Sequence, residues 1–450
     1  MTIQPIEQAA AKYPEQLAYD DGVVRATYSE LMDELSTAND GSGLGLRLAS
    51  LPVGQHVAWS PENDFLAFKM FWAIQRQACV ACPVSHRLPA AVRKQVVARL
   101  DACWLDSEFQ LVAAEVSGSG RDCPQDNVLN RPATIILSSG STGVPKAVVH
   151  SMAAHVASAE GAAKNMPLLP SDRWLWSLPL FHVSGLSVLI RCAVAGATVV
   201  GLPSDTPLSA ELLAERRITH LSVVNTQLRR LLQQGNFPSV HLKAILLGGS
   251  SVDESLVRLA RQRGIAVHTT YGLTETASQV TTSTADGDPA KSGAVLEGRE
   301  LRVAADDEIY VRGQTLCLGY FVDSEIRPVV DGQGWFRTGD LGRLDDDRQL
   351  TVFGRSDNMF VSGGENIYPE NIERAFLKAF GVEQVIVVPR VSQEYGARPV
   401  AFVAGDLPAD WQATLRQVLQ GYEVPVEVLA WPRDVELGIK PNRKRMKQLV

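Results

Sequence analysis

Short apolar segments that run into glycine, serine, threonine or asparagine recur along the first two thirds of the chain. The clearest of these segments predict buried strands at 134–137, 221–224, 244–247 and 265–269. Helical stretches lie between them, and residues 27–38 place Leu31 and Leu35 at helical spacing after a Thr-Tyr-Ser start. This alternation predicts an α/β fold whose polar loops, at the carboxyl ends of the strands, form the ligand site.

The pattern changes in residues 301–353, where shorter strand-like segments (LRVA, EIYVRG, LTVFG) alternate with turns and predict a β-rich subdomain. The polar turn Gly-Arg-Ser-Asp at 354–357 marks a domain boundary. After it we expect a helix at 369–380, a strand at 385–388 and a helix at 410–420. The fold prediction is therefore a large N-terminal domain (1–355) of stacked α/β sheets plus the β-rich subdomain, followed by a small mobile α+β domain (356–450).

Composition narrows the class of protein. The chain has 450 residues, 45% of them apolar and 21% charged, which is typical of a globular protein of two or three domains. Its net charge of -7 provides no basic field for a phosphate backbone, so we expect no nucleic-acid partner. Neither a secretory signal nor a membrane-spanning segment is visible, and a cytoplasmic location is expected. The sequence does not determine the oligomeric state, and a homo-oligomer is one alternative.

Six cysteines in a chain of this length are too few for a disulfide scaffold. Cys79 and Cys82 form a CxxC pair inside the apolar segment ACVACPV, without a second pair or a histidine cluster beside it. We interpret the pair as core, with redox or metal chemistry as the alternative.

Residues 138–146 read Ser-Ser-Gly-Ser-Thr-Gly-Val-Pro-Lys and follow a predicted buried strand. Glycines let backbone N–H groups approach a phosphate, hydroxyls add neutral donors, and Lys146 adds a positive charge. A Walker A loop needs glycine before the lysine and Ser/Thr after it, but Pro145 and Ala147 stand there, which excludes a P-loop NTPase. The segment predicts a phosphate-binding loop of another kind.

This loop resembles the signature of the AMP-forming acyl-CoA synthetases, the adenylate-forming (ANL) superfamily. Further segments resemble family motifs in the family's order: SLPLFHVSG, LGGS, YGLTETAS, WFRTGDLGRLD, GRSDNMFVSGGENIYPENIE and, near the end, Gly438-Ile439-Lys440. The resemblance spans nearly the whole chain. It implies that a carboxylic acid, ATP with Mg²⁺, and coenzyme A are the ligands, and we expect no membrane partner.

The resemblance also implies roles for individual residues. The nucleotide-binding set comprises Ser138, Ser139, Gly140, Ser141, Thr142, Gly143, Lys146, Gly249, Ser250, Tyr271, Gly272, Asp340 and Arg355. Within it, the loop holds the β- and γ-phosphates, Tyr271 faces the adenine and Asp340 accepts from the ribose hydroxyls. Thr274 donates to the α-phosphate and Glu275 is placed like the family's Mg²⁺ ligand.

Lys440 resembles the family lysine that reaches the α-phosphate and the attacking carboxylate, although Arg443, Lys444 and Arg445 leave a solvated basic tail as the alternative. Asp357 matches the family's hinge. Rotation there would withdraw Lys440 from the reacting groups and bring the loop VSGGEN (361–366) toward the thioester site before coenzyme A attacks.

Three residues bear on the acid. His182 matches a family position beside the acyl pocket, where it would gate thiol access, with a core histidine as the alternative. Arg191 lies in the apolar run LSVLIRCAVAG, and a buried guanidinium requires an anionic partner: an internal carboxylate or a second carboxylate of the substrate. Arg191 and Ser222 match positions of the o-succinylbenzoyl-CoA synthetase branch, which serves menaquinone biosynthesis.

The preferred prediction is therefore an AMP-forming acid–CoA ligase that activates o-succinylbenzoate. A ligase for another aromatic or medium-chain acid is the first alternative. A stand-alone adenylation domain that loads a carrier protein is the second, and a catalytically inactive binding module of the same fold is the third.

Overall fold

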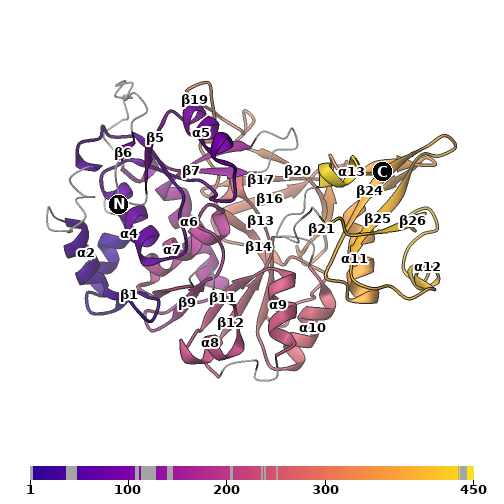
Figure 1. The fold of residues 1–450 in the computed structure, drawn as a ribbon, viewed down its shortest axis with the longest axis horizontal. Coiled ribbons are helices and arrows are strands. Elements are labelled where there is room, and N and C mark those ends of the chain that lie inside the picture. Colours follow the sequence, from indigo (N-terminus) through magenta and orange to yellow (C-terminus); the bar gives the residue numbers. More distant parts are fainter. Residues whose placement is uncertain are drawn as a thin grey trace.

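The computed structural model describes residues 4–36, 48–106, 111–112, 128–138, 145–202, 206–234, 237, 240–249, 252–433, 435 and 443–450. Figure 1 shows a large α/β body, indigo to orange, and a smaller orange-to-yellow part that carries the C-terminus at the other end. The α/β class predicted from the sequence is confirmed. No helix in the described part of the chain is long and apolar enough to cross a membrane.

An eight-stranded sheet occupies one side of the body, in the order β19-β18-β8-β7-β4-β3-β5-β6. Its strands are β3 (His56–Trp59), β4 (Val80–Pro83), β5 (Ala102–Leu105), β6 (Leu111–Val112), β7 (Pro132–Ser138), β8 (Lys146–Ser151), β18 (Gly319–Val322) and β19 (Glu325–Arg327). The central strands β5, β3, β4 and β7 are parallel, whereas β7 and β8 form an antiparallel hairpin. Helices α4 (Phe65–Arg76) and α5 (Ala90–Arg99) connect the first parallel strands.

A nine-stranded sheet follows the order β15-β14-β13-β12-β11-β9-β10-β1-β2. Its strands are β1 (Leu17–Asp20), β2 (Arg25–Thr27), β9 (Arg173–Trp176), β10 (Thr198–Gly201), β11 (His220–Val223), β12 (Ala244–Leu247), β13 (Val267–Leu273), β14 (Ser278–Thr282) and β15 (Ala294–Val295). The six from β1 to β13 in this order are parallel, and α7 (Val183–Ala195), α8 (Ala210–Glu215), α9 (Asn225–Leu232) and α10 (Glu254–Gln262) link them.

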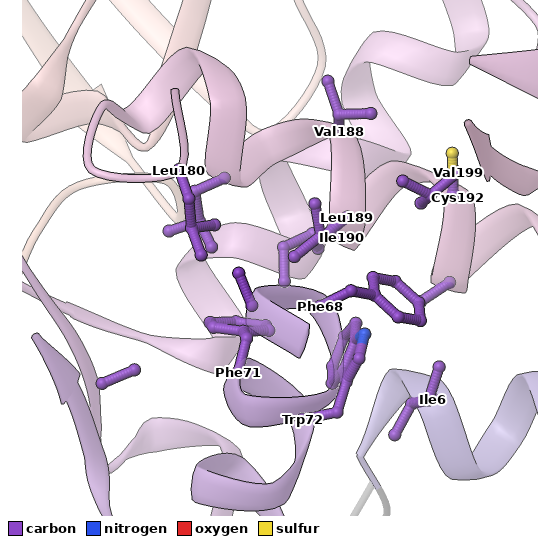
Figure 2. Close-up of a cluster of buried hydrophobic side chains, with 14 of the residues drawn as sticks. Ile6, Phe68, Phe71, Trp72, Leu180, Val188, Leu189, Ile190, Cys192 and Val199 are labelled. Carbon is purple, nitrogen blue, oxygen red and sulfur yellow. The ribbon is translucent and has the colours of Figure 1, made fainter. Parts of the chain in front are cut away.

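The largest hydrophobic core lies where helices of the body meet. Figure 2 shows Phe68, Phe71 and Trp72 of α4 against residues of α7, with Ile6 of α1 (Pro5–Lys12) beside them. Helix α7 is buried along most of its length because its sequence is largely apolar, with Arg191 and two serines as its polar residues. Helices α2 (Tyr28–Ser36) and α6 (Met152–Asn165) complete this part.

The β-rich subdomain is a four-stranded antiparallel sheet in the order β16-β17-β20-β21. Its strands are β16 (Arg299–Val303), β17 (Glu308–Gly313), β20 (Phe336–Leu344) and β21 (Leu350–Arg355). The turn after β21 leads into the C-terminal part.

The C-terminal part has its own core around Phe376 and Val387, built from residues after 359. Its elements are β22 (Phe360–Ser362), β23 (Glu365–Ile367), α11 (Pro369–Phe380), β24 (Gln384–Ser392), β25 (Gly396–Ala404), α12 (Trp411–Leu415), β26 (Glu427–Ala430) and α13 (Arg443–Lys447). Arg229 donates to the Gly381 carbonyl over 2.9 Å and Arg230 pairs with Glu383 at 3.0 Å, so helix α9 of the body contacts this part directly.

The structure corrects two element predictions. The helix expected at 410–420 ends at Leu415, after which i→i−3 bonds from Gln417 and Val418 replace the α-helical pattern. Strand β13 begins at Val267 and continues to Leu273, so Tyr271 and Gly272 lie on a strand that pairs with β14. The predicted core position of Cys79 and Cys82 is confirmed, since both side chains are buried.

Candidate active site

The phosphate-binding loop predicted at 138–146 connects the hairpin strands β7 and β8. Ser138 ends β7 and stands opposite Lys146, the first residue of β8. The Lys146 side chain is exposed, so its ammonium group faces solvent at the mouth of the hairpin. Five residues of the predicted nucleotide-binding set, Ser139, Gly140, Ser141, Thr142 and Gly143, lie outside the described residues.

Thr274 and Glu275 form a short 3-10 turn, η2 (Thr274–Thr276), between β13 and β14. The Thr274 carbonyl accepts from His150 Nε2 over 2.6 Å, and the Glu275 carbonyl accepts from the Cys317 N–H over 2.8 Å. A carbonyl only accepts, so His150 carries its proton on Nε2. Burial lowers the pKa of His150 to about 4, which keeps the ring neutral. His150 of β8 and the backbone of Cys317, two residues before β18, thus hold the backbone of this turn.

Tyr320 joins Glu275 to Lys146. Its hydroxyl donates to Glu275 Oε1 over 2.8 Å and receives a hydrogen bond from Lys146 Nζ at 3.4 Å, and the ammonium lies 4.9 Å from the ring centroid. Burial and the neighbouring Glu275 raise the pKa of Tyr320, so the phenol stays protonated. Sequence reasoning missed this residue. Glu275 itself is buried.

A second chain of contacts runs from Tyr271 to Asp357. The Tyr271 hydroxyl donates to Asp340 Oδ2 over 2.7 Å, and Arg355 Nη1 donates to Asp340 Oδ1 over 3.2 Å. Arg355 Nε also pairs with Asp357 at 3.1 Å. Burial opposes the charge on Arg355, but the two carboxylates outweigh it and raise the pKa of this guanidinium. The structure therefore brings together the residues predicted for adenine, ribose and hinge.

Backbone geometry explains two of the predicted glycines. A Cβ on Gly272 would come within 1.9 Å of the Ser278 carbonyl oxygen, so only glycine fits between β13 and β14. The adjoining residues Ala277 and Ser278 have φ values of 50° and 110°, which is strained backbone for side chains of this kind. Gly249 has a φ of 88°, which favours glycine, while Ser250 lies outside the described residues.

The candidate acid site lies beside β14, whose residues contact Arg191. Arg191 Nη2 donates to Gln279 Oε1 over 2.5 Å and to Ser278 Oγ over 3.3 Å. Its guanidinium carbon lies 5.1 Å from the centroid of Trp174, whose Nε1 donates to Ser222 Oγ over 3.3 Å. The structure therefore links Arg191 and Ser222 through Trp174, a residue that sequence reasoning did not identify.

Arg191 is buried, and its partners among the described residues are neutral. No Asp or Glu of the described chain forms an ion pair with it, and its Nε has no hydrogen-bond acceptor there. Burial lowers its pKa to about 10, so the group stays charged at neutral pH. Arg299 is a second buried cation: it donates to the carbonyls of Gln279 and Ser158, and burial followed by the charge of Arg191 lowers its pKa to about 9. This region carries positive charge that the described residues do not neutralise.

His182 precedes the first residue of α7, the helix that carries Arg191. Arg191 lies nine positions after His182 in sequence, a rise of about 13 Å along the helix axis. The His182 side chain is exposed, which rules out the core-histidine alternative. Lys440 lies outside the described residues, so the structure does not place it.

Glu275 is the residue through which the site could hold a magnesium ion. Magnesium bound mainly by phosphate oxygens and water needs only one or two protein carboxylates. A buried carboxylate beside an exposed lysine fits such a shared site. In the part of the chain that the structure describes, no group of three or more metal-ligating side chains occurs.

Comparisons with known proteins identify the family and similar structures. Residues 6–321 match the model of the family described as AMP-binding enzyme. A 2-succinylbenzoate–CoA ligase of Salmonella typhimurium is 40% identical over 419 residues, which cover 90% of each chain.

Two solved structures of the o-succinylbenzoate CoA synthetase MenE from Bacillus subtilis are similar in fold. The complex with the acyl-adenylate intermediate OSB-AMP has a TM-score of 0.86 at 26% identity and covers 99% of this chain and 98% of that one. The complex with ATP and magnesium ion has a TM-score of 0.85 at 26% identity and covers 99% of both chains. Because the family model matches residues 6–321, most of its length, this chain belongs to the AMP-binding enzyme family.

Proposed function

We propose that the protein is an AMP-forming ligase that joins 2-succinylbenzoate to coenzyme A. In the first step, the succinyl carboxylate attacks the α-phosphorus of ATP, and pyrophosphate leaves. In the second step, the coenzyme A thiol attacks the carbonyl of the acyl-adenylate, the thiol proton is lost, and AMP leaves. The relatives that bear this name, and the MenE structures with an acyl-adenylate or with ATP and magnesium, support the reaction.

The first step depends on positioning and charge. Lys146 and the loop before it hold the terminal phosphates, and Asp340, fixed by Tyr271 and Arg355, accepts from the ribose. Thr274 donates its hydroxyl to the α-phosphate from a turn whose backbone is held by His150. A magnesium ion on Glu275 neutralises phosphate charge when bound. We propose that Lys440 supplies the remaining positive charge beside the α-phosphate.

The observation that carries the choice of acid is the buried, unneutralised charge of Arg191. A guanidinium taken out of water without an anion costs free energy, and the described chain offers it only an amide, a hydroxyl and an aromatic face. An aryl acid with a second carboxylate supplies the missing anion. Arg299 reinforces the positive potential from the other side of Gln279.

The second step requires the C-terminal part to turn about Asp357, at the boundary 355/356. Asp357 is paired with Arg355, so the hinge is tied to the residue that also holds Asp340. Rotation would bring the β22–β23 hairpin to the thioester site. Its turn residues Gly363 and Gly364 have φ values of 61° and 89°, which a two-residue hairpin turn requires. His182 would lie at the entrance through which the coenzyme A thiol reaches the acyl-adenylate. We also propose a cytoplasmic location for the protein.

Two matched acids test the proposal. 2-Succinylbenzoate and 4-oxo-4-phenylbutanoate share the activated succinyl chain and differ only in the ring carboxylate. With ATP, Mg²⁺ and coenzyme A, we expect thioester from the first with a kcat/KM about 10- to 100-fold higher than from the second, as expected for a charge-assisted hydrogen bond. In Arg191→Met this ratio should fall towards one. A wild-type protein that uses both acids equally would contradict the assignment of the acid.

A further inference from the structure

Tyr320 stands between two oppositely charged side chains that the proposed function assigns to ATP. Its strand β18 pairs with β8, so that Tyr320 lies opposite Val148, two residues after Lys146. The hydroxyl group contacts both charged groups, at 2.8 Å from Glu275 Oε1 and 3.4 Å from Lys146 Nζ. The ring lies beneath the ammonium group, 4.9 Å from its nitrogen.

Lys146 and Glu275, both among the described residues, contact Tyr320 and form no direct ion pair with each other. Lys146 is exposed on a flexible stem and Glu275 is buried, and an ammonium that reached a buried carboxylate would gain more than it gains in water. In such a pair Lys146 would be less available to bind the phosphates, and Glu275 would be less available to bind the metal. The phenol gives Glu275 a neutral donor, and the ring gives Lys146 a weak cation–π partner. Neither contact removes a charge from the site.

We propose that Tyr320 is a positioning residue that orients the Glu275 carboxylate for magnesium and keeps it apart from Lys146 until ATP binds. The second carboxylate oxygen stays available for the metal. This inference rests on the proposed function, because that function assigns Glu275 to magnesium and Lys146 to the phosphates.

Calorimetric titration of ATP at a series of Mg²⁺ concentrations, without any organic acid, tests the inference apart from catalysis. For Tyr320→Phe we expect the Mg²⁺ concentration that gives half-maximal ATP affinity to rise about tenfold, as expected when a hydrogen bond to a charged group is lost. Tyr310→Phe is the matched control. Tyr310 lies on β17 and packs against Arg302 of β16, and loss of its hydroxyl should leave the Mg²⁺ dependence unchanged. The conversion of supplied acyl-adenylate and coenzyme A to thioester, which bypasses the metal-dependent step, should be unaffected in Tyr320→Phe.

A double-mutant cycle shows whether Tyr320 acts through Glu275. In a Glu275→Gln background, Tyr320→Phe should change the Mg²⁺ dependence less than twofold, because the group it orients is already gone. An unchanged Mg²⁺ dependence in the single variant, or the same tenfold change in both backgrounds, would overturn the inference while leaving the proposed function intact. A wild-type protein that does not bind ATP with Mg²⁺ would overturn both.

Discussion

The phenolic oxygen of Tyr271 lies 2.7 Å from Oδ2 of Asp340, although 69 residues separate the two in sequence. Arg355 donates a hydrogen bond to the other carboxylate oxygen, so both oxygens of the buried Asp340 accept hydrogen bonds from protein side chains. This relationship fixes the carboxylate plane toward the place where the ribose is expected. It also ties a strand of the nine-stranded sheet, β13, to the β-rich subdomain through β20.

Replacing Tyr271 with phenylalanine should weaken ATP binding without unfolding the protein. The change removes one hydrogen bond to a charged acceptor, worth about 1.5 to 3 kcal/mol, so the KM for ATP should rise about tenfold or more. The KM for the acid should change little. Steady-state kinetics with each substrate varied in turn would check this, and an unaltered KM for ATP would show that the hydroxyl is not needed.

Alanine at Gly272 should destabilise the fold. The added methyl group would meet the Ser278 carbonyl at 1.9 Å, in a segment whose backbone is already strained, and overpacking of this kind costs about 1 to 3 kcal/mol. Gly332→Ala is the control, because no heavy atom lies within 4 Å of its Cβ position. Thermal unfolding of both variants should show a clear loss for the first only. Equal melting temperatures would contradict the packing argument.

Arg191→Met should separate stability from acid binding. A buried charge without an internal anion is expensive to keep, and replacement by an apolar side chain of similar length is often neutral or stabilising. We therefore expect the unliganded variant to melt at or above the wild-type temperature, even though Gln279 loses a donor. The stabilisation that 2-succinylbenzoate gives the wild type should disappear. A large drop in melting temperature would instead assign Arg191 a structural role.

Buried histidines should make stability depend on pH. Burial lowers the pKa of His150 and of His220 to about 4, below the value of about 6.5 in an unfolded chain. Between these values the unfolded state binds more protons, so the free energy of unfolding falls as the pH decreases from 6.5 towards 4, by at most about 1.4 kcal/mol per pH unit for each histidine. Denaturant titrations at several pH values should show a shallower dependence for His150→Gln, which keeps a donor for Thr274. An identical slope would contradict this.

The sequence was sufficient wherever a residue's role depends on its neighbours in the chain. Helix 369–380 and strand 244–247 were predicted with their observed bounds because each apolar pattern is bounded by local signals: proline and glycine for the helix, charged residue and glycine for the strand. The α/β class followed from the alternation of such segments.

Contacts between distant segments could not be predicted. Tyr320 is 45 residues from Glu275 and 174 from Lys146, and only the pairing of β18 with β8 brings it to them. The neutral hydrogen-bond partners of Arg191 likewise come from β14, about 87 residues further along the chain. Predicted roles for Lys440 and for the loop residues 139–143 remain predictions, because these positions lie outside the described residues.

The most direct test of the proposed ligase activity is to identify the products of one reaction. Purified protein with ATP, Mg²⁺, coenzyme A and 2-succinylbenzoate should give the acid's coenzyme A thioester, AMP and pyrophosphate in equal amounts, as followed by mass spectrometry and phosphate analysis. Lys440→Ala should lose the formation of AMP but should still convert supplied acyl-adenylate to thioester. If wild-type protein forms no AMP with this acid, or if Lys440→Ala forms it at the wild-type rate, the account of a ligase built around Lys146, Glu275 and Arg191 is wrong.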